Sequence, residues 1–355
     1  MKKIIYSVAL AASGLGMVSC NEKLNIAAPY KDITVVYGML DIADTAHYIR
    51  IQKAYMDENQ SAIDMAKVAD SNFYRALEVT MKEINAAGTV RSIISLSKVD
   101  LAKEGFRKDS GVFFNTPNYA YKFKYPLSAD NRYRIVIRNT NTGNVDSAET
   151  DIINNTGSYN VFGLTEWIFS GSLVSFSQIQ SDAGKLRQSE YSAHVPANSG
   201  DAELLVRFNW IDSNTATGTS VRRSADYTGF GYKSSMSTPL PTTFGLVSTN
   251  KDIFDFLKSA IGPAGPNQYR YMDSLDMILY AAGVEYRRFK DLNGFKGGLT
   301  ADEIKPLYTN IKGKDVMGLL STRAFAARYQ IGFGPETKDS LSNGSITKEL
   351  NIRFK

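Results

Sequence analysis

The chain has 355 residues, of which 43% are hydrophobic and 22% charged, and its formal net charge is +5. This length is typical of about two folded domains. The mild charge occurs in pairs such as Arg222-Arg223 rather than in dense patches, which argues against nucleic acid as a partner. Cys20 is the single cysteine, so intramolecular disulfides and zinc sites built from several thiolates are excluded.

The first twenty residues have the form of a bacterial lipoprotein signal. Two lysines precede an apolar run from Ile4 to Val18, which leads to Cys20. The run is too short to span a bilayer comfortably and has signal-peptide flanks. We expect removal of residues 1–19, acylation of Cys20 by chains such as palmitate, and a tether over residues 20–30. The expected location is the outer membrane, on its periplasmic or cell-surface face. The alternatives are a secretory leader with a leftover thiol and a membrane-helix anchor.

Residues 31–155 carry the pattern of an immunoglobulin-like β-sandwich. Short stretches rich in β-branched and aromatic residues alternate between polar and apolar side chains, with turn residues between them. Over 47–55, for example, Tyr48 and Arg50 fall on one face and Ile49 and Ile51 on the other. Several short strands without helices between them favour a sandwich. The expected strands are 33–40, 47–55, 76–84, 90–96, 119–125, 132–138 and 145–152.

Residues 156–355 are predicted to form a larger β-rich domain with a helical segment at about 250–310. The stretch 252–261 is predicted to be a helix that ends at Gly262-Pro263. A longer helix is predicted over 268–289, because Met272, Leu275 and Leu279 keep helical spacing. Strands are expected at 166–169, 172–179, 203–210, 319–331 and 346–354. The predicted fold class is therefore mainly β.

Four short stretches, in a fixed order, carry a family resemblance. They are 33–40 soon after Cys20, 75–84, 132–137 running into 148–150, and 308–318 downstream of the expected Tyr-rich helix around 269–279. Together they resemble a Bacteroidota lipoprotein family of unknown function, in which an Asn-Ile then Gly pattern, here from Asn310, precedes the terminal strands. The resemblance implies β-sandwich proteins of the outer envelope that are often encoded beside TonB-dependent receptors. It implies no activity and no site residues.

The residues that carry common catalytic chemistry are sparse. His47 and His194 are far apart in sequence, and each is expected to be a surface or pairing residue at a strand end. A Gly-x-Ser-x-Gly elbow, a phosphate-binding Gly-Lys-Ser loop and a His-Glu-x-x-His motif are all absent from the sequence. We therefore expect no catalytic residue, no metal and no cofactor. A carboxylate pair for glycoside hydrolysis stays open, because its members need only meet in space.

Aromatic residues are the candidates for ligand contacts. The chain holds 20 Tyr and 18 Phe, a composition that suits packing in extracytoplasmic β-proteins and also sugar-binding surfaces. We expect exposed contacts at Trp167, Tyr227, Phe230 and Tyr232, with burial of Trp167 in a sandwich as the alternative. The last three lie in or beside a Gly-, Ser- and Tyr-rich loop over 222–233, a composition that suits adaptable recognition.

Four tripeptides match Asp, then Ser or Thr, then a small or aliphatic residue. This pattern resembles the O-glycosylation acceptor of the Bacteroidota periplasm. The acceptor hydroxyls would be those of Thr45, Ser147, Ser274 and Ser340. A buried hydroxyl cannot be modified, so we expect glycan on Thr45 and Ser147 where they sit on exposed loops.

These features predict a non-enzymatic, lipid-anchored envelope protein that works by binding. The expected role is that of an accessory to a TonB-dependent outer-membrane transport system. Its partners would be the outer membrane, reached through the anchor, and a TonB-dependent receptor. The alternatives are a lipoprotein that binds a surface polysaccharide and, third, a glycoside hydrolase.

Overall fold

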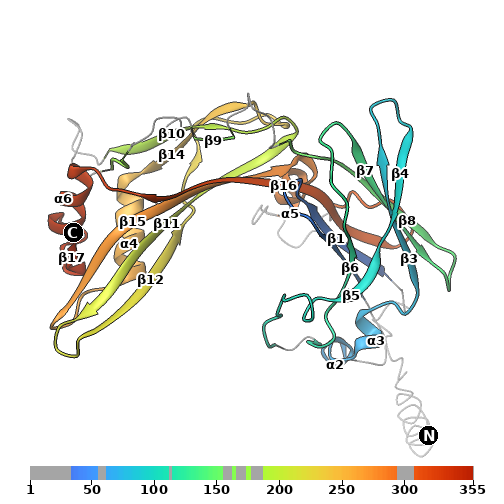
Figure 1. Ribbon diagram of the computed structural model, residues 1–355, viewed down its shortest axis with the longest axis horizontal. Helices are drawn as coiled ribbons and strands as arrows, with labels where there is room; N and C mark the ends of the chain where they lie inside the picture. The colour runs from blue at the N-terminus through green and yellow to red at the C-terminus, as the bar shows by residue number, and fades with distance from the viewer. Residues whose placement is uncertain are drawn as a thin grey trace, which may run out of the picture.

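The computed structural model describes residues 33–54, 61–111, 114–154, 162–164, 173–176, 187–293 and 308–354. Over these residues the chain is mainly β, as the sequence predicts, and its strands form three sheets arranged in two lobes (Figure 1). The expected signal peptide, Cys20 and the tether lie outside the described residues. Each helix within them falls short of the length and apolar character that a membrane crossing requires.

The first lobe is an immunoglobulin-like sandwich. Its strands are β1 (Ile33–Leu40), β2 (His47–Ala54), β3 (Leu77–Ile84), β4 (Val90–Ser95), β5 (Ser97–Asp100), β6 (Tyr119–Phe123), β7 (Arg132–Asn139) and β8 (Val145–Asp151). The order β1-β2-β6-β5 in one sheet and β4-β3-β7-β8 in the other corresponds to the two sheets of an immunoglobulin domain, with β4 as an added edge strand. Two short helices, α2 (Ala62–Ala66) and α3 (Ala69–Asn72), connect β2 to β3. The seven strands predicted for this region are confirmed, and β5 is additional.

Alternation along these strands produces the sandwich core. Ile49 from one sheet and Met81 and Ile135 from the other are fully buried in a single cluster. Tyr48 and Arg50 lie on the opposite face of β2 and are half-buried, as the alternation predicts. Successive side chains of a strand point to opposite sides, so one face of β2 fills the core and the other remains available.

A buried tyrosine anchors the turn into β7. The Tyr133 hydroxyl accepts a hydrogen bond from the Ser128 backbone N–H (2.8 Å) and donates one to Glu83 (3.2 Å). This is the tyrosine corner typical of immunoglobulin-like sandwiches. Burial disfavours the charge of Glu83, but hydrogen bonds from Tyr125, Asn131 and Tyr133 outweigh it and hold the pKa of Glu83 below its usual value.

The second lobe is built on long antiparallel strands. Its elements are β9 (Gly163–Leu164), β10 (Gln188–His194), β11 (Ser199–Asn214), β12 (Thr219–Tyr227), β13 (Gly231–Tyr232), β14 (Thr243–Thr249), α4 (Asn250–Ile261), β15 (Gln268–Gly283), α5 (Val284–Asn293), β16 (Val316–Ile331), α6 (Pro335–Asn343), a 3-10 turn (Lys348–Leu350) and β17 (Ile352–Arg353). The order β12-β11-β15-β16 forms one layer, and β13-β14-β10-β9 forms another. Phe208 of β11, Leu246 of β14 and Phe254 of α4 are buried in one core between them.

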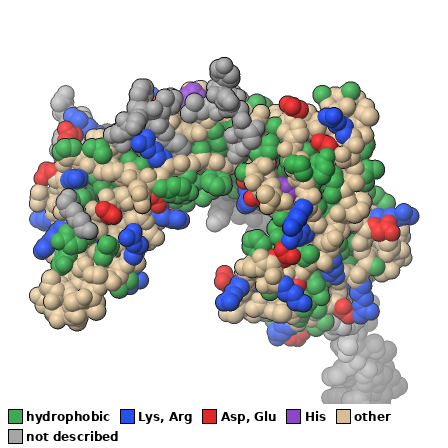
Figure 2. Space-filling model, viewed as in Figure 1, with side chains coloured by type: hydrophobic (Ala, Val, Ile, Leu, Met, Phe, Trp, Pro, Cys, Tyr) green, Lys and Arg blue, Asp and Glu red, His purple; other side chains and the backbone are tan. Residues whose placement is uncertain are grey.

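Strand β16 belongs to both lobes. Its first half pairs in parallel with β1 from Val316 to Thr322, and its second half pairs antiparallel with β15 from Arg323 to Ile331. The sheet of the first lobe that contains β1 is therefore extended by a strand from near the C-terminal end of the sequence. Figure 2 shows the molecule hollowed between the two lobes, below the span that joins them.

The helix predicted over 268–289 is wrong. Residues Gln268–Gly283 form β15, and helix α5 begins only at Val284. β15 pairs along one edge with β11 and along the other with β16. Where the pairing with β11 shifts between Asn209 and Trp210, β15 has one extra residue, so Met272 and Leu275 are buried three positions apart and also fit helical spacing. Pairing on both edges overrides that local periodicity. The strand predicted over 346–354 is likewise wrong, apart from the two residues of β17.

The Asn-Ile stretch before β16 holds that strand against the sandwich. The Asn310 side chain accepts a hydrogen bond from the Leu320 N–H (3.0 Å) and donates one to the Leu320 carbonyl (2.7 Å). Ile311 packs into the sandwich core. Gly318 lies directly against the Val36 backbone, where a Cβ atom would come within 2.7 Å of the carbonyl carbon. These contacts give the sequence pattern a structural role.

Candidate functional site

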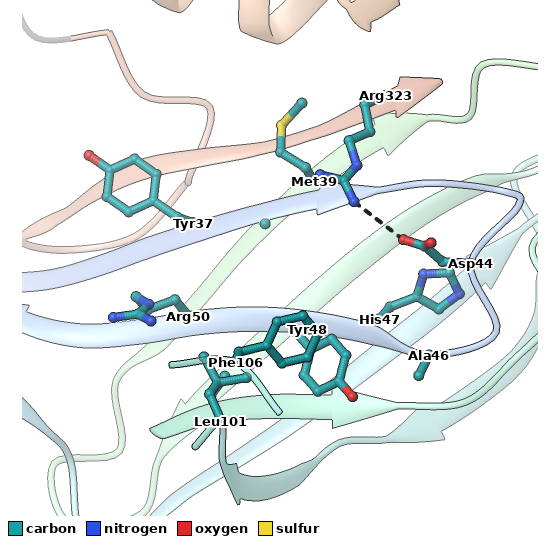
Figure 3. A pocket seen from close by; sticks show the side chains of 12 residues that line it. Tyr37, Met39, Asp44, Ala46, His47, Tyr48, Arg50, Leu101, Phe106 and Arg323 are labelled. Carbon is teal, nitrogen blue, oxygen red and sulfur yellow. Dashed lines mark ion pairs between the residues drawn. The ribbon is translucent and has the colours of Figure 1, made fainter. Parts of the chain in front are cut away.

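A groove opens on the outer face of the first-lobe sheet, across β1 and β2. It consists of a cavity of about 470 Å³ and a second of about 450 Å³, which share Tyr48, Arg50, Leu101 and Phe106. Both volumes fall in the range of small-molecule sites. The other charged or ionisable lining residues are Tyr37, Asp44, His47, Arg107, Lys108, Asp109 and Arg323. We call this feature the β1–β2 groove; Figure 3 shows its larger cavity.

One end of the groove is electrostatically balanced. Arg323, from β16, lies 3.5 Å from Asp44 and 3.7 Å from Asp41, and Figure 3 marks the pair with Asp44. Burial raises the pKa of Asp41, while a hydrogen bond from the Ala43 N–H opposes that rise. Because β16 continues into the second lobe, this end of the groove is tied to both lobes.

His47 lies at the same end and is held by the fold. Its ring stacks on Phe123 with centroids 4.7 Å apart, and Nε2 donates to the Tyr125 carbonyl at 3.1 Å. Burial lowers the pKa of His47, although the Tyr125 carbonyl favours the protonated form. Among the described residues, Nδ1 has no hydrogen-bond partner. The imidazole is therefore neutral near pH 7 and has a structural anchor rather than a nucleophile beside it.

Two aromatic rings form the wall at the middle of the groove. The rings of Tyr48 and Phe106 meet edge to face with centroids 5.2 Å apart. The Tyr48 hydroxyl donates to Glu104 at 3.0 Å, and Glu104 also forms an ion pair with Lys122. The Tyr48 ring is therefore fixed, whereas Phe106 is 53% exposed and available for contact.

The opposite end carries a positive charge. Arg50 is paired in register with Tyr37 of β1, and Figure 3 shows both residues away from the Arg323–Asp44 pair. No residue that the structure describes forms an ion pair or side-chain hydrogen bond with Arg50. Burial lowers the pKa of its guanidinium. Burial and the nearby charge of Arg50 also lower the pKa of Lys108.

A separate polar cavity of about 460 Å³ differs from the β1–β2 groove in how its charges are paired. Its two arginines are matched by carboxylates, with Arg132 3.0 Å from Asp151 and Arg134 2.6 Å from Glu149. Such exposed pairs need no ligand to balance them. Within the described ranges, no three His, Cys, Asp or Glu side chains gather as metal ligands would. The β1–β2 groove is therefore the stronger candidate for ligand recognition.

The aromatic residues selected from sequence do not line this groove. Tyr227 and Phe230 are only 7% and 8% exposed, so the expectation of exposed contacts is wrong for both. The Tyr227 ring contacts Phe230 and also Phe256 of α4, which makes them part of the second-lobe core. Tyr232 is half-buried and donates to Asp201 at 2.8 Å. Trp167 lies outside the described residues.

The four candidate glycan acceptors differ in accessibility. Thr45 is exposed in the turn between β1 and β2. Ser147 and Ser274 are half-buried within β8 and β15, and Ser340 is buried in α6. Thr45 alone among these four therefore meets the condition of an exposed loop.

Sequence reasoning found part of the groove. Alternation placed Tyr48 and Arg50 on one face, and it correctly placed His47 at a strand start and His194 at a strand end. It could not bring in Phe106 or Arg323, because a loop and a strand distant in sequence contribute them. The two histidines lie on strands of different lobes.

Comparison with known proteins adds little. No protein-family model matches the chain, and no curated protein matches it in sequence. Among solved structures, the chain is similar to the C-terminal globular domain of an oligosaccharyltransferase from Pyrococcus abyssi, with 10% identity and a TM-score of 0.21. That match covers 68% of this chain and 44% of the other, so the chain spans less than half of that structure. A similarity this low carries no argument about function.

Proposed function

We propose that this chain is a non-enzymatic, lipid-anchored protein of the cell envelope that works by binding, as an accessory to a TonB-dependent outer-membrane receptor. The observation that carries the binding role is the β1–β2 groove. Tyr37 and Phe106 expose 44% and 53% of their surface there, and covering such rings on binding is favourable. The anchor rests on the sequence around Cys20, and the receptor rests on the family resemblance.

The chemistry of the groove supports binding over hydrolysis. Glycoside hydrolysis needs two carboxyl groups that face each other across the scissile bond. Of the two described carboxylates that line the groove, Asp44 is engaged by Arg323, and Asp109 lies exposed in the smaller cavity. His47 is held by the Tyr125 carbonyl. What the groove presents to a ligand is aromatic surface and positive charge. An acyl anchor would add to affinity, because it raises the local concentration of the groove near a membrane partner.

The test is recovery of partners from native outer membranes in mild detergent. The tagged full chain is compared with a groove variant, Tyr37→Ser combined with Phe106→Ser. The control combines Val90→Ser with Ile93→Ser, two exposed apolar residues of β4 in the other sheet. We expect the unaltered chain and the control to recover one TonB-dependent receptor stoichiometrically and the groove variant to lose it. A Cys20→Ala variant should recover less, because it lacks the anchor.

Other outcomes would redirect the proposal. Equal recovery of a receptor by the groove variant would place the contact elsewhere on the surface. Recovery of the lipoprotein alone would contradict a stable receptor complex and favour the glycan-binding alternative, which the Tyr48 and Phe106 rings support. That alternative predicts that polysaccharide embedded in a native gel retards the unaltered chain and not the groove variant.

A further inference from the structure

Arg50 is a positive charge that none of the described residues neutralises. It projects from the outer face of β2 and lines both cavities of the β1–β2 groove. None of the described residues forms an ion pair or side-chain hydrogen bond with it. Removing a charge from water without a partner costs free energy, and burial accordingly lowers the pKa of this guanidinium.

A second cation lies close to Arg50 in the groove. Lys108 lines the same cavity, and its Nζ donates to the Phe114 carbonyl at 2.8 Å. Of the carboxylates that line the groove, Asp44 is paired with Arg323, and Asp109 is exposed on the loop. In the separate polar cavity, by contrast, arginines are matched by carboxylates. Since no described carboxylate pairs with Arg50, this end of the groove favours anions.

We propose that the Arg50 end of the β1–β2 groove binds the carboxylate of an organic acid whose ring or chain lies against Phe106 and Tyr48. This inference rests on the proposed binding function and specifies its ligand class. The planar guanidinium can donate two parallel hydrogen bonds to a carboxylate, and such charge-assisted pairs are strong and directional. The edge-to-face rings of Tyr48 and Phe106 supply the adjoining apolar wall.

A matched pair of sugars tests the carboxylate directly. Glucuronate and glucose differ by a carboxylate in place of a hydroxymethyl group, and inorganic phosphate serves as an anion without a ring. Binding of the two sugars to the full chain in deuterated detergent is followed by saturation-transfer NMR. Binding of phosphate, which has no carbon-bound protons, is followed by the broadening of its phosphorus-31 resonance. Both measurements are made at low salt, because salt screens the contact. We expect glucuronate to bind at least about tenfold more tightly than glucose, the scale of one charge-assisted contact.

Three variants separate the contributions. Arg50→Gln should reduce the preference for glucuronate to near one, whereas Arg91→Gln should preserve it. Arg91 is an exposed arginine on β4 in the other sheet, so its loss changes net charge equally. Phe106→Ala should weaken the binding of glucuronate and of glucose by the same factor. Unfolding midpoints of all variants show that each remains folded.

The outcomes distinguish this inference from the proposed function. Equal binding of both sugars, weakened by Phe106→Ala and unchanged by Arg50→Gln, would overturn the carboxylate site and leave the groove as a binding site. Phosphate binding that depends on Arg50, without glucuronate binding, would contradict an organic acid as the ligand. The ligand would then be inorganic phosphate or the phosphate of a lipid headgroup. Binding of none of the three probes would overturn the inference, while receptor recovery tests the proposed function independently.

Discussion

Substitution of Gly318 by alanine tests how β16 joins the two lobes. Gly318 pairs with Val36 and has φ of +129°, a conformation that side chains rarely adopt. A Cβ atom there would approach the Val36 carbonyl carbon and nitrogen to 2.7 and 2.8 Å. The unfavourable φ costs about 1–2 kcal/mol. The clash is with backbone, which cannot rotate away, so neighbouring ladder hydrogen bonds worth about 1 kcal/mol each must break.

Gly88→Ala isolates the conformational part of that cost. Gly88 also has a positive φ, +81°, but nothing lies within 4 Å of its added Cβ. We expect Gly88→Ala to lower the free energy of unfolding by about 1–2 kcal/mol and Gly318→Ala by about 3–5 kcal/mol. The difference of about 2–3 kcal/mol is the contribution of two or three ladder bonds.

Urea unfolding followed by far-ultraviolet circular dichroism measures both losses. Because β16 pairs with β1 and β15, we also expect the Gly318→Ala transition to broaden or separate as the lobes uncouple. Equal losses for the two alanine variants would refute the reasoning, since they would show that the close approach to Val36 has no energetic consequence.

Four further results are expected. Tyr133→Phe leaves the half-buried Ser128 N–H without its acceptor and should lower the unfolding free energy by about 1–3 kcal/mol in urea titrations, with an unchanged value arguing against the tyrosine corner. The fold lowers the pKa of His47 below 6.5, so the unfolded chain binds more protons than the folded chain as the pH drops through 6.5. The free energy of unfolding should therefore fall over this range, and His47→Gln should flatten this part of its pH profile. Arg50→Met removes a half-buried charge that no described residue pairs and should raise the unfolding free energy by about 0.5–1 kcal/mol, whereas a lower unfolding free energy would indicate a stabilising partner. Intact-mass analysis of protein from the native host should show glycan that disappears in Thr45→Ala, and a mass of peptide plus lipid alone would reject modification.

Local pattern was sufficient for the first lobe and insufficient for β15. In β2 the strict alternation of Tyr48, Ile49 and Arg50 is compatible only with a strand, because a sandwich strand buries every second side chain. In β15 the extra residue between Met272 and Leu275 makes the buried positions compatible with a helix as well. Nothing local to 268–283 reveals the two neighbouring strands that decide between these structures.

The sequence by itself determined the mainly β fold, the immunoglobulin-like first lobe and the face of β2 on which Tyr48 and Arg50 lie. These properties depend on side-chain periodicity and turn residues within a few positions of each other. Only the tertiary structure decided that β16 crosses both lobes, that Tyr227 and Phe230 are buried, and that Arg323 and Phe106 line the same groove as Arg50. The physical reason is that pairing, burial and charge balance depend on residues that are distant in sequence, and these become neighbours only when the chain is folded.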